Sequence, residues 1–326
     1  MICHRRKFLA TAGALSLLNV LAPAHADPRF PSRPLKVVVP FAPGGSNDLV
    51  ARLLAPKFQA AMGQPVLVDN KAGAGGAIGV QAVAQAEPDG YTILFHSNSI
   101  VIQPILVKEP GYDALRDFVP VSVTTAAPLV LSIHPSVPAQ TFPEFLEYAR
   151  ANGSRMFYGS AGHGASQHLV GELFNSMAGT KMQHVPYKGN GPASAALIAG
   201  EIQVLFDIIP ISRPLAESGR VRILAVTSKT RNPSLPQIPS IHEAGVPDFV
   251  FMNWQAMWLP KKTPDAIVQR WLGDARKVLA DQHIQAQLGE HGYQVVGSSP
   301  DELVDRMQRD SAQWAKVISG AGIRVD

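Results

Sequence analysis

Short apolar segments alternate along this chain with stretches in which apolar residues recur every three or four positions. The apolar segments are rich in β-branched residues and predict strands at 37–39, 66–68, 92–95, 119–123, 129–133, 203–206 and 223–226. The intervening stretches predict helices, and the part from Pro264 onward shows the helical pattern without a clear strand. This alternation predicts an α/β fold with parallel sheets and helices on both faces.

Residues 37–48 carry a buried strand directly into a glycine turn and a helix. Gly44 and Gly45 allow backbone angles that other residues resist, and Ser46 or Asn47 is expected to cap the helix. The first amides of a helix lack internal partners and carry the positive end of its dipole, so the turn favours a carboxylate or a phosphate. A strand, two glycines and a helix also form ordinary connections.

A second turn of the same kind occurs at 157–169, where an aromatic strand end leads through three glycines into a helix. Two helix starts that face one cleft would hold one carboxylate. Burying a carboxylate costs several kcal/mol, whereas each charge-assisted hydrogen bond returns about 1.5 to 3 kcal/mol. About four or five donors from the two turns would therefore hold it without an arginine. The alternative is that both turns are independent structural loops.

Residues 1–26 have the pattern of an export signal peptide. Arg5, Arg6 and Lys7 precede an apolar stretch at 10–21 and a small-x-small cleavage site at 24–26. The paired arginines also resemble a twin-arginine signal, and Sec export remains open. The apolar stretch is too short for a comfortable transmembrane helix. We expect a soluble periplasmic protein.

Removal of that segment changes the charge balance. The whole chain has 29 basic and 25 acidic side chains. Without the three basic residues of the segment, 26 basic side chains remain against 25 acidic ones. The sequence pI of 9.2 therefore overstates the basicity of the remaining chain. Nucleic acid is therefore not an expected partner. The only cysteine, Cys3, lies in the same segment, which leaves no disulfide or thiol chemistry. The remaining length suggests two domains.

The sequence also offers candidates for a dinucleotide site, a metal site and a catalytic serine, but each departs from the motif that it needs. The glycine-rich stretch at 70–79 does not fit a dinucleotide motif because Ile78 breaks its spacing, so no cofactor is expected. His163 and His168 are five residues apart, off the spacing that pairs metal ligands on a helix, so no metal site is expected. The chain is not expected to be an enzyme, since G-x-S-x-G is absent. An exported hydrolase or metal-dependent enzyme using Ser160 and His163 is the alternative.

Several segments in one order resemble a known family. They are residues 40–48, 70–76, 88–92, 184–192, 206–207 and 224–228. Together they closely resemble the Bug (TctC-like) family of substrate-binding proteins of tripartite tricarboxylate transporters, over nearly the whole chain after residue 26. The order of several independent motifs is more specific than any single one.

The resemblance implies a type II periplasmic-binding-protein fold, with two α/β domains and a ligand cleft between them. Domain one would comprise 27–126 plus 250–326, and domain two 127–249. It also implies an extracytoplasmic, monomeric receptor that captures a small organic carboxylate and delivers it to membrane transporter subunits. A ligand-sensing subunit for a membrane kinase is a further alternative.

The resemblance also implies the site residues. The first loop would comprise Phe41, Gly44, Gly45, Ser46, Asn47 and Asp48, and the second Ser160, Gly162, His163, Gly164, Ala165 and Ser166. The walls and gate would comprise Ser97, Asn98, Tyr187 and Asp207. Because Asp207 is acidic, we expect it to receive an ammonium, a hydroxyl or a water rather than a carboxylate.

Overall fold

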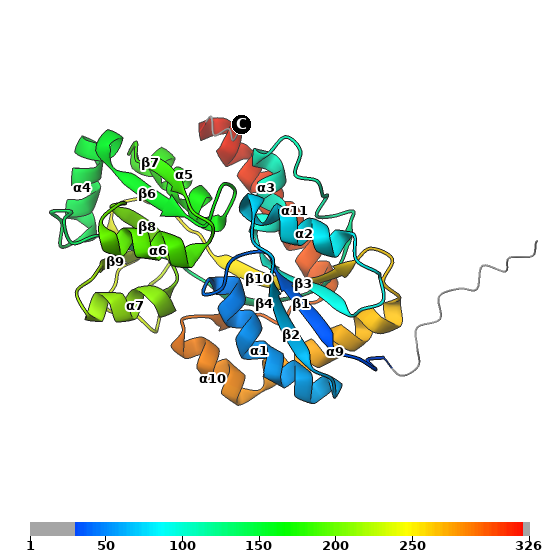
Figure 1. The fold of residues 1–326 in the computed structure, drawn as a ribbon. Coiled ribbons are helices and arrows are strands. Elements are labelled where there is room, and N and C mark those ends of the chain that lie inside the picture. The colour runs from blue at the N-terminus through cyan, green and yellow to red at the C-terminus, as the bar shows by residue number, and fades with distance from the viewer. Residues whose placement is uncertain (1–29, 322–326) are drawn as a thin grey trace, which may run out of the picture.

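The computed structural model describes residues 30–321, which form two lobes with one sheet each (Figure 1). The sheet of the first lobe has the order β11 (Gln294–Val295), β4 (Phe118–Ala127), β10 (Asn253–Pro260), β3 (Thr92–Ser97), β1 (Leu35–Val39), β2 (Val66–Asn70). The sheet of the second lobe has the order β7 (Gln183–Pro186), β6 (Phe157–Ser160), β8 (Val204–Asp207), β5 (Val130–Ile133), β9 (Arg222–Val226). The chain thus enters the second lobe after β4 and returns before β10. The expected signal peptide lies outside the described residues.

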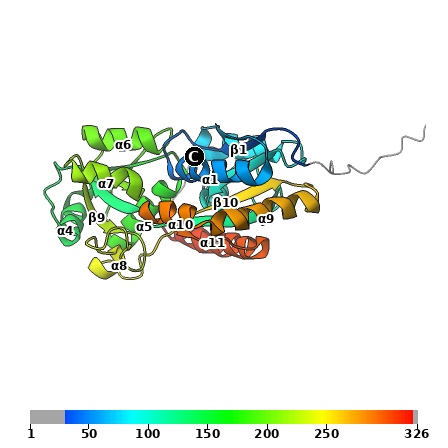
Figure 2. The same ribbon diagram turned by 90° about the horizontal axis from the view of Figure 1, so that it is seen from below.

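Helices cover both faces of the sheets, as α1 and α11 do on opposite sides of β10 in Figure 2. In the first lobe they are α1 (Ser46–Met62), η1 (Ala74–Gly76), α2 (Ala77–Ala84), α3 (Ser99–Leu106), α9 (Asp265–Ala280), α10 (Gln282–Glu290) and α11 (Pro300–Ala321). In the second lobe they are α4 (Phe142–Asn152), η2 (Gly153–Arg155), α5 (Ser166–Ala178), α6 (Asn190–Ala199), α7 (Ile209–Glu217) and α8 (Ile241–Ala244). The α/β fold class is confirmed.

The predicted strands all form, but the sheets are mixed rather than parallel. Strand β10 runs antiparallel to β3 and β4, and β5 runs antiparallel to β8 and β9. The parallel arrangement holds for β1 with its neighbours and for β6 with its neighbours. The antiparallel strands stand next to the crossings between the lobes. There the chain passes into the other lobe and does not form the helical crossover that joins parallel neighbours. The short β11 was also missed, since two residues give no readable pattern.

Three of the tryptophans lie in the core. Trp254 and Trp258 on β10 are fully buried, as is Trp271 on α9. The indole of Trp254 donates a hydrogen bond to Asp310 at 2.7 Å, which satisfies its one polar group. Packing rather than ligand stacking therefore explains the tryptophan pair on β10.

Two segments cross between the lobes, one between β4 and β5 and one between β9 and β10. Thr227 makes hydrogen bonds that hold these crossing segments together. Its hydroxyl accepts the Leu129 amide at 2.8 Å, and its carbonyl oxygen accepts the Phe251 amide at 2.7 Å. Thr227 is fully buried. The crossing segments are thus held side by side, and a relative rotation of the lobes would act on these few residues.

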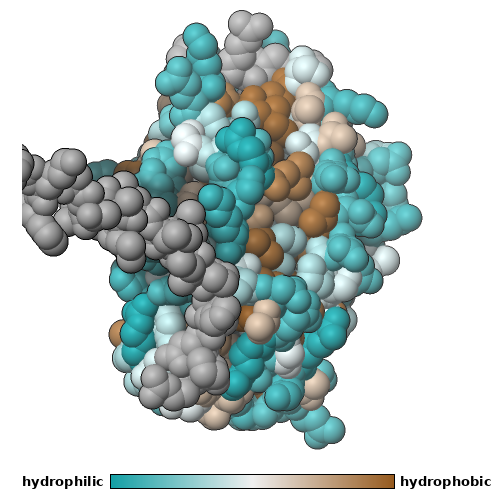
Figure 3. All heavy atoms as spheres, turned by 90° about the vertical axis from the view of Figure 1, so that its right-hand side faces the viewer, coloured by the Kyte–Doolittle hydropathy of each residue, from teal (hydrophilic) through white to brown (hydrophobic). Residues whose placement is uncertain are grey.

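The surface is mainly polar on the face that Figure 3 shows, with apolar residues gathered in a strip across it. Large apolar side chains exposed among the described residues are Leu67, Ile78, Leu115, Met177, Val250 and Val296. Within residues 30–321, no helix is both long enough and apolar enough to span a bilayer.

Candidate functional site

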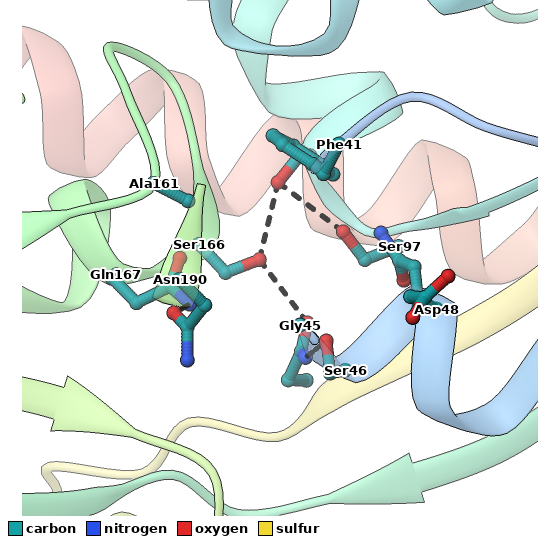
Figure 4. A pocket seen from close by; sticks show the side chains of 12 residues that line it. Phe41, Gly45, Ser46, Asp48, Ser97, Ala161, Ser166, Gln167 and Asn190 are labelled. Atoms are coloured by element: carbon teal, nitrogen blue, oxygen red, sulfur yellow. Dashed lines mark hydrogen bonds between the residues drawn. The ribbon is translucent and has the colours of Figure 1, made fainter. Parts of the chain in front are cut away.

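A small cavity lies between the lobes (Figure 4). The centre of a water molecule can occupy about 20 Å³ of this cavity. That space is roughly large enough for one or two atoms of a polar group. The lining comprises Phe41, Gly45, Ser46, Asn47, Asp48, Ser97, Ser99 and Asn253 from the first lobe, and Ala161, Ser166, Gln167 and Asn190 from the second. It contains no lysine or arginine.

Two helices begin at this cavity. The strand β1 leads to α1, whose first residue is Ser46, and β6 leads to α5, whose first residue is Ser166. The preceding residues, Gly45 and Ala165, have no side-chain acceptor, so they cannot cap the first amides. The prediction that Ser46 or Asn47 caps α1 is wrong, because Gly45 holds the N-cap position. The positive ends of both helices therefore face the same space.

Asn253 connects these two helix starts. Its side-chain amide donates to the Ser46 hydroxyl at 3.1 Å, and its side-chain oxygen lies 3.1 Å from the Ser166 hydroxyl. The Ser166 hydroxyl also lies 2.8 Å from the side-chain oxygen of Asn98 and 3.1 Å from the hydroxyl of Ser99. Figure 4 shows Ser46 and Ser166 on opposite sides of the cavity. This network joins the lobes through neutral polar groups.

Asp48 lines the cavity but uses its oxygens within its own lobe. It accepts the Gly44 amide at 3.0 Å, the Arg52 guanidinium at 2.9 Å and the Asn70 side chain at 3.0 Å. Burial raises the pKa of Asp48, but these hydrogen bonds together lower it below its ordinary value. Gly44 has φ of +90°, which favours glycine in the turn. Asp48 therefore shapes the turn.

Asp207 lies one layer behind the cavity. It is 1% exposed and accepts hydrogen bonds from Asn190, from the Ser194 hydroxyl at 2.9 Å and from the Ile208 amide at 2.7 Å. Burial raises the pKa of Asp207 to about 6. Asn190 in turn accepts a hydrogen bond from Gln167. Asp207 reaches the cavity only through Asn190, contrary to its expected place in the wall.

Ser160 is fully buried and holds the second loop. Its hydroxyl lies 2.6 Å from Nε2 of His184 and 3.0 Å from the carbonyl oxygen of Gly162. The nucleophile and base suggested by Ser160 and His163 are therefore not found as a pair, because His184 occupies the position beside the hydroxyl. Ser160 lies behind the cavity lining, where a substrate has no direct access.

A second cavity, of about 400 Å³, adjoins the first. The two share Phe41 and Ala161 in their linings, and the second is also lined by Gly162, His163 and Tyr187. Its opposite wall is formed by residues 73–77 of the first lobe. The small polar cavity thus adjoins the larger one at Phe41 and Ala161.

Glycines allow the lobes to touch at the rim of these cavities. A Cβ atom on Gly75 would lie 2.0 Å from the carbonyl oxygen of His163, and one on Gly189 would lie 2.9 Å from Cβ of Ala42. Real Cβ atoms do not come so close. The structure is therefore closed around the cavity.

The structure brings together part of the predicted site. The residues that line the first cavity are Phe41, Gly45, Ser46, Asn47, Asp48, Ser97 and Ser166. Those that line only the second cavity are Gly162, His163 and Tyr187. Those outside both linings are Gly44, Asn98, Ser160, Gly164, Ala165 and Asp207.

Sequence reasoning missed several residues of the first cavity, namely Ser99, Ala161, Gln167, Asn190 and Asn253. Asn190 had a readable signal, because it begins α6 directly after Gly189 and so repeats the glycine and helix pattern. Asn253 gave none, since it begins a strand far along the chain.

The two lobes, the crossing segments and the cavity between them define a two-lobed solute-binding receptor. The chain belongs to the TctC family: a family model described as "Tripartite tricarboxylate transporter family receptor" matches residues 50–323. This is a family of receptors rather than enzymes.

Curated relatives match over nearly the full chain. A UPF0065 protein from a Pseudomonas species, encoded in the tcbD-tcbE intergenic region, is 37% identical over 96% of this chain and 94% of its own. Protein BugT of Bordetella pertussis is 34% identical over 98% and 96%.

Solved structures agree with this assignment. The periplasmic binding protein BugD is 34% identical, with a TM-score of 0.87 over 90% of this chain and 99% of its own. R. palustris Rpa4515 with adipate is 36% identical, with a TM-score of 0.87 over 90% and 99%. MatC from Rhodopseudomonas palustris with bound malate is 30% identical, with a TM-score of 0.84 over 89% and 100%. The two-domain periplasmic-binding-protein fold is thus confirmed.

Proposed function

We propose that this receptor binds a small organic carboxylate between its lobes and delivers it to the membrane subunits of a tripartite tricarboxylate-type transporter. One observation carries the ligand class: two uncapped helix starts face a cavity whose lining has no cationic side chain. Related structures with adipate and malate support the same class.

The carboxylate would lie between the first turns of α1 and α5. Amides of both turns and the hydroxyls of Ser46, Ser97 and Ser166 would donate to it. Each such bond to a charged acceptor contributes about 1.5 to 3 kcal/mol, and each helix end adds about 0.3 to 1 kcal/mol. Several donors therefore outweigh a desolvation cost of several kcal/mol. The body of the ligand would extend past Phe41 and Ala161 into the larger cavity.

Binding would couple to closure of the lobes. We assign domain one to residues 27–126 plus 250–326 and domain two to 127–249, with Thr227 holding the crossing segments together. A carboxylate that accepts bonds from both helix starts favours the closed arrangement over an open one, because only the closed arrangement supplies all the donors.

Calorimetric titration tests the ligand class. We expect adipate or malate, or another small dicarboxylate of a panel, to bind, and the neutral diamide adipamide to bind at least about a hundredfold more weakly, since it cannot engage the helix ends as an anion. Binding of uncharged analogues as tightly as of every acid tested would contradict the proposal.

A pair of serine variants tests the location. Ser166→Ala should weaken binding by about ten- to a hundredfold, because one donor to a charged group is lost. Ser132→Ala is the matched control: its hydroxyl is also buried and lies 2.9 Å from another serine hydroxyl, that of Ser212, but wholly within the second lobe. Equal affinity in both variants would place the ligand elsewhere.

The partner and location also belong to this proposal. We infer a monomer in the periplasm, exported by residues 1–26, that acts as a receptor and performs no catalysis. Capture of membrane proteins by the ligand-loaded receptor should recover transporter subunits, whereas recovery of a membrane kinase would favour the sensor alternative.

A further inference from the structure

Three histidines gather at the second loop, outside the lining of the small cavity. They are His163, in the loop before α5, His168 in the first turn of α5, and His184 on β7. One ring nitrogen from each lies within 4.8 Å of the others. The sequence argument against a metal relied on helical spacing, which does not apply because His163 precedes the helix. We propose that these histidines form a binding site for one divalent transition-metal ion of the zinc and copper class.

The distances fit a site that contracts slightly on binding. Zinc binds imidazole nitrogens at about 2.0 to 2.1 Å in a tetrahedral arrangement. Starting from mutual separations of up to 4.8 Å, each nitrogen needs to move only about 1 Å toward a common centre to reach that bond length. His163 is exposed, so the ion has a path from solvent, and water would complete the coordination.

Ser160 orients one of the three rings. Its hydroxyl donates to the carbonyl oxygen of Gly162 at 3.0 Å, so it is free to accept the Nε2 proton of His184 at 2.6 Å. That tautomer leaves Nδ1 of His184 as an unprotonated donor for a metal. Histidines that bind metals commonly donate their other ring proton in this way, which fixes the ring and raises its basicity.

His168 is the ring that has to turn. It is stacked on His184, with ring centroids 4.0 Å apart and planes 27° apart. Its Nδ1 accepts the Gly164 amide at 3.2 Å, a long hydrogen bond that a metal bond can replace. His163 meets both rings edge-on, at 86° to His168 and 80° to His184. Binding of one ion by all three rings therefore requires His168 to tilt out of this stack.

The protonation states of His168 and His184 suit a cation. Burial lowers the pKa of His168 to about 4, with further lowering from His163, and burial lowers the pKa of His184 to about 2, with further lowering from His168 and His163. Both rings are therefore neutral at neutral pH, as metal binding requires. Imidazole suits zinc, copper and nickel and does not suit magnesium or calcium. These preferences set the choice of probes.

The test is calorimetric titration of chelator-treated, full-length protein with Zn²⁺ and separately with Mg²⁺. We expect one Zn²⁺ per chain and no Mg²⁺ binding. His163→Ala and His168→Ala should each weaken Zn²⁺ binding by at least tenfold, whereas His283→Ala, an exposed histidine of α10 outside the cluster, should leave it unchanged. Absence of Zn²⁺ binding, or equal affinity in all three variants, would overturn the site.

A spectroscopic measurement on the unaltered protein removes any dependence on how the variants fold. Cu²⁺ bound at one equivalent should show couplings to several imidazole nitrogens in its electron paramagnetic resonance spectra. Ser160→Ala should keep these couplings but weaken binding by about tenfold, as loss of a group that orients a ligand does. Coupling to a single imidazole would mean adventitious surface binding and would overturn the proposal.

Discussion

The Cα atom of Gly75 lies so near the backbone of His163 that a Cβ atom there would be 2.0 Å from the His163 carbonyl oxygen. This contact joins η1 in the first lobe to the second loop of the second lobe. It gives a glycine of the 70–79 stretch a role in closure.

Gly75→Ala should therefore hinder closure and weaken carboxylate binding by at least about tenfold, equivalent to about 1.4 kcal/mol. The comparison variant is Gly63→Ala. Both glycines have positive φ, +62° and +70°, but a Cβ on Gly63 meets nothing within 4 Å. Small-angle scattering with and without ligand should show compaction in Gly63→Ala and little in Gly75→Ala. Normal affinity in the latter would mean that the lobes need not meet here.

Asp48→Asn should destabilise the protein at neutral pH by about 1 to 3 kcal/mol, because hydrogen bonds to a charged acceptor are lost. The pKa of Asp48 is lowered by folding, so its contribution is present above about pH 4 and disappears as the pH falls. Urea unfolding of both proteins should therefore converge at low pH. Asp69→Asn, which removes partly exposed ion pairs with Lys36 and Lys71, should change stability by less than about 1 kcal/mol.

Asp207 should produce the opposite pH dependence. Its pKa rises to about 6 in the folded protein, so the folded state holds the proton more tightly than the unfolded state. The stability of the parent relative to Asp207→Asn should then fall as the pH rises from about 4 to 6, by up to about 3 kcal/mol. Denaturant unfolding across this range measures the difference. Parallel profiles for the two proteins would show that Asp207 does not titrate in this window.

Asn190 and Ser194 both donate to Asp207, but only Asn190 lines the cavity. Each alanine variant should lower stability by about 1 to 3 kcal/mol, because a buried acceptor loses a donor. Only Asn190→Ala should also weaken carboxylate binding, by at least about tenfold. Thermal unfolding and calorimetric titration of the two variants separate these effects. A comparable loss of affinity in Ser194→Ala would assign the effect to Asp207 itself.

Local sequence patterns predicted several elements without knowledge of the fold. The β-branched run at 37–39 formed part of β1, and the glycine turn led into α1. Each of these follows from contacts between residues near in sequence or from simple burial. The same patterns misplaced the N-cap of α1, which is Gly45, one residue before Ser46.

The sequence by itself determined the α/β class, the two anion-favouring turns and, through the order of its motifs, the receptor family. The tertiary structure alone decided which side chains meet. Asn253 reaches the two helix starts, Asp207 lies behind Asn190, and His184 comes beside His163 and His168 through pairing of β6 with β7. These neighbours are distant along the chain, and their meeting depends on strand order and lobe closure, which local periodicity does not encode.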